Sequence, residues 1–305
     1  MGTRLAFVGA GRLTRSLGGA LVAAGHRVEV VAARRAGAAR SAARALGAPR
    51  ATTRTALALD AEVIVLGVPD SAIAGVAAAL ARAGDRIPWR RRVVLHAAGA
   101  LGPEPLAVLA AAGASTGVLH PLQVLDGRPD PAGLRGCAAR IEGGARATRV
   151  AARLARDCGM EPLRLAGHAA AAERLAYHAA ASLAANDVVA LLSWAIRLFG
   201  EAGVPPRRAR RALAALCRGA ADRLADGGLS AALTGPVVRG DAATLIGHLR
   251  RLDSLDTRTG AAHRLLSAQL LELEHEVVGR LDPGRRRRVK TALRPPAGRS
   301  RTPTV

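Results

Sequence analysis

The sequence contains little that would support a membrane span, a disulfide framework or a metal site. No run of about 18 residues is both apolar and uncharged, so we expect no transmembrane helix. The three cysteines, Cys137, Cys158 and Cys217, are widely spaced and form no CxxC pair, which favours a reducing, cytoplasmic location. No basic and then apolar segment resembling an export signal opens the chain. No HExxH or comparable ligand spacing occurs, so we expect no metal.

Lysine and aromatic residues are also scarce. Lys290 is the only lysine, so the net charge of +22 comes almost wholly from arginine, and aromatic residues make up 2% of the chain. So few rings leave little surface for base stacking, and we do not expect a nucleic-acid partner. Residues 284–305 contain eight basic residues and no acid. This composition predicts a disordered basic tail over residues 282–305.

The first half of the sequence alternates short apolar runs with helical stretches rich in alanine and leucine. Strands separated by helices predict parallel pairing through right-handed crossovers. The expected strands are residues 4–9, 27–34, 61–70, 92–99, 115–123, 137–143 and 160–167. We therefore expect an α/β domain over residues 1–167, built on a doubly wound, mainly parallel Rossmann sheet.

After Gly167 the pattern becomes helical throughout. The expected helices cover residues 168–203, about 205–224, 242–252 and 257–280, with a turn-rich loop at 226–244. The sequence therefore predicts an all-helical second domain over residues 168–281.

A glycine-rich loop joins the first strand to the first helix. The segment GAGRLT places two glycines where a tight turn and a close backbone approach to a pyrophosphate are needed, and the helix after it offers free N–H groups. A threonine stands where a third glycine is usual. We assign the loop to cofactor binding: Gly9, Ala10, Gly11, Arg12, Leu13 and Thr14. The alternative is a sheet of this type that has lost its cofactor.

The end of the second strand indicates which dinucleotide binds. NAD sites place an acid there to hold the ribose 2′-hydroxyl, whereas this chain has alanines followed by Arg34 and Arg35. Arginine suits a 2′-phosphate, so we expect NADP rather than NAD. The alternative is that both are solvated arginines in an arginine-rich protein. Val68 and Pro69, at the end of the strand expected over 61–70, are assigned to the same site.

Several motifs together resemble one known family. GAGRLT, VPDSAI, LHPLQ, YHAAASLAAN and ALTGPVVRGDAATLIGHL recur in a Rossmann-like oxidoreductase family whose C-terminal half is known only as a domain of unknown function. The resemblance covers about residues 3–255. The architecture is similar to pyrroline-5-carboxylate reductase and the β-hydroxyacid dehydrogenases. The resemblance implies that the helical half forms a homodimer and completes the active site.

The first long helix of the second half carries the main candidates for chemistry. The β-hydroxyacid dehydrogenases use a lysine on this helix, and this chain has none there. His178, Ser182 and Asn186 follow each other at intervals of four, which puts them on one helix face. His178 could exchange a proton with the substrate, Ser182 could bind it and Asn186 could orient it. The alternative is a histidine held by a carbonyl where two domains meet. Tyr177 points about 100° away from His178 and is expected to pack.

Loops supply further candidates. His120 and Gln123, in LHPLQ, follow a strand at the sheet edge where ligands bind, so His120 is a rival catalytic residue and Gln123 a substrate contact. A loop-anchoring role for His120 is an equal alternative. His96 also ends a strand and ranks behind both. Arg239 could pair with a substrate carboxylate, or with Asp241 to shape its turn, and Asp241 could cap the next helix.

These residues predict an NADP-dependent oxidoreductase that moves hydride to or from a small carboxylate-bearing keto, imino or hydroxy acid. A non-catalytic NADP-binding sensor or scaffold is the alternative, because the usual lysine is absent.

Overall fold

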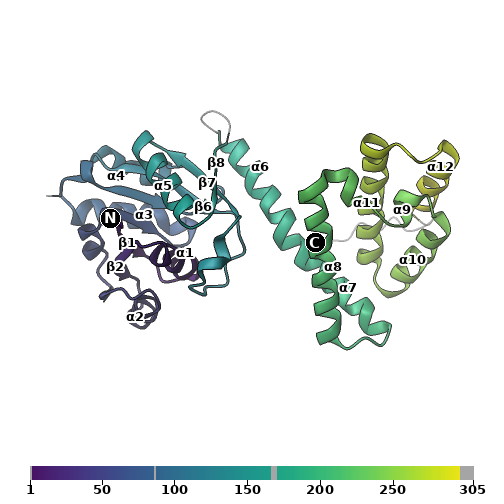
Figure 1. Ribbon diagram of the computed structural model, residues 1–305, viewed down its shortest axis with the longest axis horizontal. Helices are drawn as coiled ribbons and strands as arrows, with labels where there is room; N and C mark the ends of the chain where they lie inside the picture. Colours follow the sequence, from purple (N-terminus) through teal and green to yellow (C-terminus); the bar gives the residue numbers. More distant parts are fainter. Residues whose placement is uncertain (1, 86, 166–169, 296–305) are drawn as a thin grey trace. The chain divides into compact units, whose positions relative to one another are not determined.

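The structure is a computed structural model that describes residues 2–85, 87–165 and 170–295. The chain divides into two compact units, Met1–Asp187 and Val188–Val305. The first unit contains the whole sheet and the helix that follows it, and the second is helical (Figure 1). The division falls after Asp187. The boundary expected at Gly167 lies outside the described residues.

An eight-stranded sheet forms the centre of the first unit. Its strand order is β3-β2-β1-β4-β5-β6-β7-β8, and every neighbouring pair is parallel except β6 and β7, which are antiparallel. The strands are β1 (Arg4–Val8), β2 (Arg27–Ala32), β3 (Arg50–Thr52), β4 (Val63–Leu66), β5 (Val93–His96), β6 (Ser115–Pro121), β7 (Ala138–Gly143) and β8 (Glu161–Leu163). The fold class expected from the sequence is confirmed.

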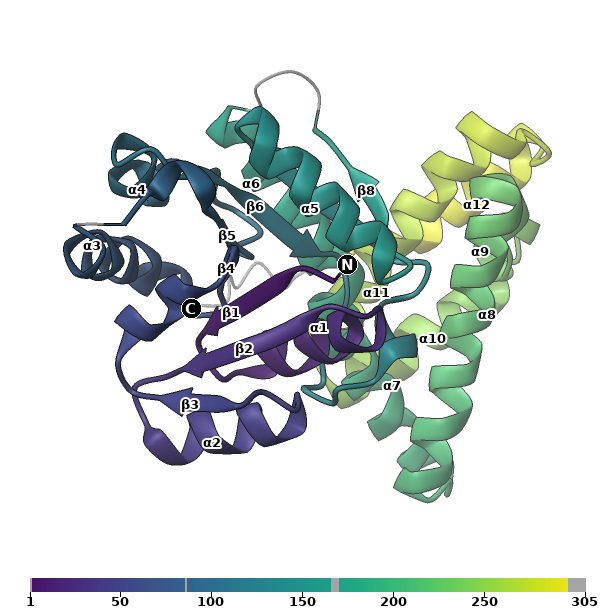
Figure 2. The same cartoon turned by 60° about the vertical axis from the view of Figure 1, so that its left-hand side comes forward.

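Helices cover both faces of this sheet, because the central strands are apolar on both sides (Figure 2). In β1, Leu5 and Phe7 face a core shared with α1 (Arg12–Ala23), α2 (Ala36–Ala45) and α5 (Ala145–Asp157). Ala6 and Val8 face the other core, which α3 (Ile73–Ala83) and α4 (Ala107–Ala111) close.

The second half of the chain consists of helices joined by short turns. They are α6 (Ala171–Ser182), in the first unit, followed by a π-helical segment (Leu183–Asp187), and then α7 (Val188–Glu201), α8 (Pro206–Ala232), α9 (Pro236–Arg239), α10 (Ala242–Leu255), α11 (Thr257–Leu273) and α12 (Pro283–Ala292). Asp241 accepts a hydrogen bond from the backbone N–H of Thr244 and caps α10, as expected. A small core joins α9 to α12: Val237, Leu245, Leu249, Leu271 and Val289.

The elements differ from the sequence predictions in several places, and α9 stands within the loop expected over 226–244. Strand β3 was missed, because it is three residues long and partly polar. Helix α8 runs to Ala232, past the expected end near residue 224, with a break at Gly228. The prediction of a disordered tail is wrong for residues 283–292, which form α12 because Asp282 caps it and Val289 is fully buried. Residues 296–305 lie outside the described part of the chain.

Candidate active site

A cavity of about 830 Å³ opens at the carboxyl ends of β1, β2 and β4. Its walls are the three segments that follow these strands, Gly9–Gly11, Ala33–Arg35 and Gly67–Pro69, together with Ala38, Thr53, Thr55, Ser71, Ala72 and Val76. This is the position where doubly wound sheets hold a dinucleotide.

Glycines let the backbones approach closely at this edge. Gly9 has a φ of +114°, and a Cβ there would lie 2.1 Å from the carbonyl oxygen of Gly67. A Cβ on Gly67 would in turn lie 2.7 Å from Oγ1 of Thr14. Gly11 faces open space, directly before the first turn of α1. The N–H groups at the start of this 12-residue helix are therefore accessible to an anion.

Thr14 has a different role from the neighbouring loop residues. It is fully buried, and its hydroxyl donates to the carbonyl oxygen of Gly9 at 2.9 Å. This hydrogen bond links the two ends of the glycine-rich loop, and a glycine at position 14 could not form it. Arg12, Leu13 and Thr14 lie outside the residues that line the cavity, whereas Gly9, Ala10, Gly11, Arg34, Arg35, Val68 and Pro69 line it.

Arg34 and Arg35 follow the second strand and line the cavity. Both are exposed, and no hydrogen bond or ion pair joins either guanidinium to the described part of the chain. The residues before them, Ala32 and Ala33, carry no acid. A phosphate placed here would meet two uncommitted cations.

A second group of polar side chains gathers beside β5, the next strand along the same sheet. A Cβ on Gly99 would lie 3.1 Å from Nε2 of His120, at the end of β6, and 3.4 Å from Cδ2 of His178, on α6. The two histidines that the sequence offered as rival candidates therefore meet at one point. A side chain at position 99 would be in tight contact with the His120 ring.

Tyr177 completes this cluster. Its hydroxyl lies 3.1 Å from Nδ1 of His120, and the two rings meet edge to face with centroids 5.8 Å apart. The sequence predicts only that Tyr177 points away from His178 and packs. The bond to His120 was not predicted, because helical spacing does not reveal which neighbour a side chain meets in the fold.

A charged network lies beneath the cluster. Arg140 is fully buried and contacts Glu142, which also accepts from Arg174 on α6 at 3.1 Å. Arg174 reaches Glu104 at 2.8 Å as well. The network fastens α6 to β7 and to the segment after β5, and so fixes the helix that carries Tyr177 and His178.

Burial and charge both act on the histidines. Burial, followed by the positive charge of Arg140 and by His178 and His96, lowers the pKa of His120 to about 4. Burial also lowers the pKa of His96 and raises that of Tyr177. His120 and Tyr177 are therefore both uncharged at neutral pH. His96 accepts from the backbone N–H of Ala98 and donates to the carbonyl of Gly102, so it holds the turn after β5.

The remaining predicted residues lie outside these contacts. The π-helical segment alters the spacing after Ser182, whose hydroxyl accepts from Asn186 at 3.3 Å, and Asn186 is exposed. Gln123 is exposed and accepts from the backbone of Val124. Arg239 is an exposed residue of the second unit, in the last turn of α9.

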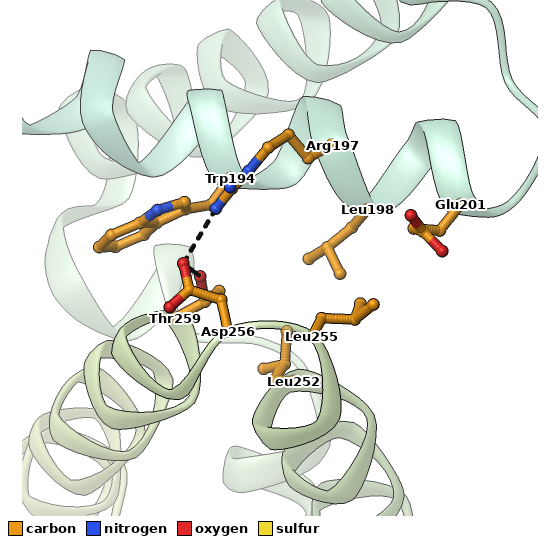
Figure 3. A pocket seen from close by; sticks show the side chains of 8 residues that line it. All are labelled: Trp194, Arg197, Leu198, Glu201, Leu252, Leu255, Asp256 and Thr259. Atoms are coloured by element: carbon orange, nitrogen blue, oxygen red, sulfur yellow. Dashed lines mark hydrogen bonds and ion pairs between the residues drawn. The ribbon is translucent and has the colours of Figure 1, made fainter.

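The second unit contains a much smaller cavity, of about 120 Å³, between α7, α10 and the start of α11 (Figure 3). Arg197 and Asp256 form an ion pair at 3.1 Å on one side of it, and Leu198, Leu252 and Leu255 fill the other. The charged residues that line it already have partners, since Arg197 pairs with Asp256 and Glu201 pairs with Arg251.

Two family models match the chain. The Rossmann-like domain matches residues 3–121, and the Domain of unknown function (DUF2520) matches residues 137–270. The chain therefore contains a Rossmann-like domain followed by a DUF2520 domain. The resemblance drawn from the sequence motifs is confirmed. No curated protein matches the chain.

Solved structures share this fold over most of the chain. A candidate NADP oxidoreductase from Bacteroides fragilis has a TM-score of 0.70 at 23% identity, covering 89% of this chain and 98% of its own. Pyrroline-5-carboxylate reductase from Coxiella burnetii has a TM-score of 0.61 at 15% identity, covering 88% and 99%. The Plasmodium falciparum pyrroline carboxylate reductase with NADP bound has a TM-score of 0.58 at 11% identity, covering 89% and 98%. At these identities the likeness concerns the fold.

Proposed function

We propose that this protein is an NADP-dependent oxidoreductase acting on a small keto, imino or hydroxy acid. The observation that carries the proposal is the arrangement along one sheet edge. A glycine-lined cavity with two unpaired arginines stands at β1, β2 and β4, and His120, His178 and Tyr177 gather beside the adjacent strand β5. The fold shared with an NADP-bound reductase supports the choice of cofactor.

The residues that line the cavity suit the parts of an NADP molecule. Gly9–Gly11 and the first turn of α1 would hold the pyrophosphate through backbone N–H groups. Arg34 and Arg35 would hold the 2′-phosphate. When bound, the cofactor supplies or accepts a hydride at its nicotinamide ring.

The histidine cluster would supply the proton that the reaction needs. In the reducing direction the substrate C=O or C=N accepts the hydride at carbon, and its bonding electron pair moves to oxygen or nitrogen. His178 gives that atom a proton, because it is exposed and faces Gly99. Arg140 and Arg174 are already paired with carboxylates, so a substrate carboxylate would need another cation.

We also propose that the protein is a homodimer through its helical half. The helix Ala171–Glu201 has a mean hydropathy of 1.5 over its most apolar window and is long enough to cross a membrane, yet none of that window is buried. The same helix places Tyr177 and Arg174 in contact with the sheet, which favours packing against a second copy over insertion in lipid. Sedimentation of the full chain at a mass of two chains is the expected result, and a monomer would contradict it.

Replacing His178 tests the catalytic part of the proposal. Keto, imino and hydroxy acids are screened for NADPH oxidation or NADP reduction. With the substrate so found, His178→Ala should lower turnover by roughly 10²–10⁴-fold, the usual contribution of a positioned acid or base. NADPH affinity should stay nearly unchanged, because the cavity residues are untouched.

The matched control is His275→Ala, which removes an exposed histidine from the second unit and should keep full activity. Full activity in His178→Ala would remove this residue from the mechanism. A folded, NADPH-saturated protein that is inactive across the whole screen would contradict the enzyme and favour an NADP-binding sensor.

A further inference from the structure

Arg140 and His120 face each other across the one antiparallel pair of the sheet. The register pairs His120 of β6 directly with Arg140 of β7, so their side chains leave the same face of the sheet as neighbours. The Arg140 side chain is fully buried. A buried cation is costly unless it is paired and hydrogen-bonded, and Arg140 has both kinds of partner.

Arg140 forms hydrogen bonds with the segments next to the cluster of His120, Tyr177 and His178. Its Nη1 lies 2.5 Å from a carboxylate oxygen of Glu142, and its Nη2 donates to the carbonyl oxygens of Ala98 and Leu101 at 3.0 and 2.6 Å. These carbonyls flank Gly99, the residue that His120 and His178 approach. The guanidinium carbon also lies 5.7 Å from the centroid of the Tyr177 ring. One side chain therefore fixes the turn at Gly99 and supports Tyr177.

The charged and titratable groups around His120 all disfavour its protonation. They are Arg140 from β7, His178 from α6 and His96 from β5, and burial acts in the same direction. Tyr177, also from α6, contributes a neutral hydroxyl. The imidazole is therefore neutral, with one nitrogen that donates and one that accepts.

The bond to Tyr177 decides which nitrogen donates. A phenol O–H is more acidic than an imidazole N–H, and an imidazole nitrogen is a stronger acceptor than a phenol oxygen, so the hydroxyl donates to Nδ1. The proton of the imidazole then sits on Nε2. This nitrogen faces Gly99, and no described residue forms a hydrogen bond with it.

We propose that Tyr177 and Arg140 are positioning residues that present His120 to the substrate as a neutral Nε2–H donor. The inference rests on the proposed function and gives the two histidines, His120 and His178, different roles. The N–H of His120 donates a hydrogen bond to the substrate oxygen or nitrogen and stabilises the charge that develops there as hydride arrives at carbon. His120 keeps its proton, and His178 supplies the one that is transferred.

The test reads the tautomer of His120 in the full chain, without cofactor or substrate. Long-range ¹H–¹⁵N correlation distinguishes protonated from bare ring nitrogens, and His120→Gln identifies the His120 signals by their loss. His96 is an internal reference, because a backbone N–H donates to its Nδ1 and fixes its proton on Nε2. The expected result is a single Nε2–H tautomer for His120 down to about pH 5.

Tyr177→Phe keeps the ring and removes only the hydroxyl. The His120 signals should then change to a mixture of tautomers, whereas Ser193→Ala, which removes an exposed hydroxyl of the second unit, should leave them unchanged. With a substrate in hand, Tyr177→Phe should lower kcat roughly 10-fold to 100-fold with little change in KM.

Three results would overturn the inference. They are an Nδ1–H or mixed tautomer in the unaltered protein, a single Nε2–H tautomer that persists in Tyr177→Phe, and an imidazole that titrates near its ordinary value. None of these readings needs hydride transfer, so this inference can fail while the proposed oxidoreductase stands, and the two failures are distinguishable.

Discussion

The two halves of the sheet edge are built by different means. At β1, β2 and β4 the cavity depends on backbone, on glycines and on exposed arginines that bond to nothing else described. Beside β5, β6 and β7 the site depends on side chains that hold one another, with Arg140, Tyr177 and His120 in contact across three segments. The first half can be recognised from a short sequence motif, whereas the contacts of the second half form only when distant segments come together in the fold.

The largest effect should come from filling the contact between Gly9 and Gly67. In Gly9→Ala the added methyl would lie 2.1 Å from a backbone oxygen, at a φ of +114° that side chains rarely adopt. We expect the free energy of unfolding to fall by more than about 3 kcal/mol and NADPH affinity to fall by at least roughly 100-fold. Urea unfolding and calorimetric titration measure the two effects.

Gly37→Ala is the matched control, because its methyl would meet nothing within 4 Å and it lies in α2. Its stability should be equal or slightly higher, by about 0.5 kcal/mol, since alanine favours a helix. A Gly9→Ala protein with normal stability and affinity would show that the backbone contact does not shape the cavity.

The same contrast explains what the sequence could and could not predict. The strand pattern, the loop at Gly9 and the arginines at the end of β2 are local signals, so the fold class and the position of the cavity followed from them. His120 and His178 were found as separate candidates. Their meeting at Gly99 was not predicted, because they are 58 residues apart and only the fold brings them together.

Other features of the site had no local signal at all. Arg140 lies in a strand of an arginine-rich chain, where nothing in the sequence marks it as buried. Tyr177 was assigned to packing from helical geometry alone. The register that sets Arg140 opposite His120 depends on β7 running antiparallel to β6, and the predicted alternation of strands and helices did not specify this pair. Helix α12 was not predicted either, because its basic composition is typical of a disordered tail.

A smaller effect should appear in the pH dependence of stability. The folded pKa of His120 is about 4, below its unfolded value, so the unfolded chain binds a proton first as pH falls. Stability is therefore lost between about pH 6.5 and pH 4, by on the order of 2 kcal/mol from this residue. His120→Asn should flatten that decline in urea unfolding at several pH values. An unchanged slope would contradict a depressed pKa.

The most direct test of the central claim is the titration of the full chain with NADPH and with NADH by calorimetry. Arg34 and Arg35 offer unpaired cations at the end of β2 with no acid beside them, so NADPH should bind at least ~10-fold more tightly, about 1.4 kcal/mol. Arg34→Ala together with Arg35→Ala should remove most of the difference and leave NADH affinity nearly unchanged. Equal or tighter binding of NADH by the unaltered chain would contradict the account.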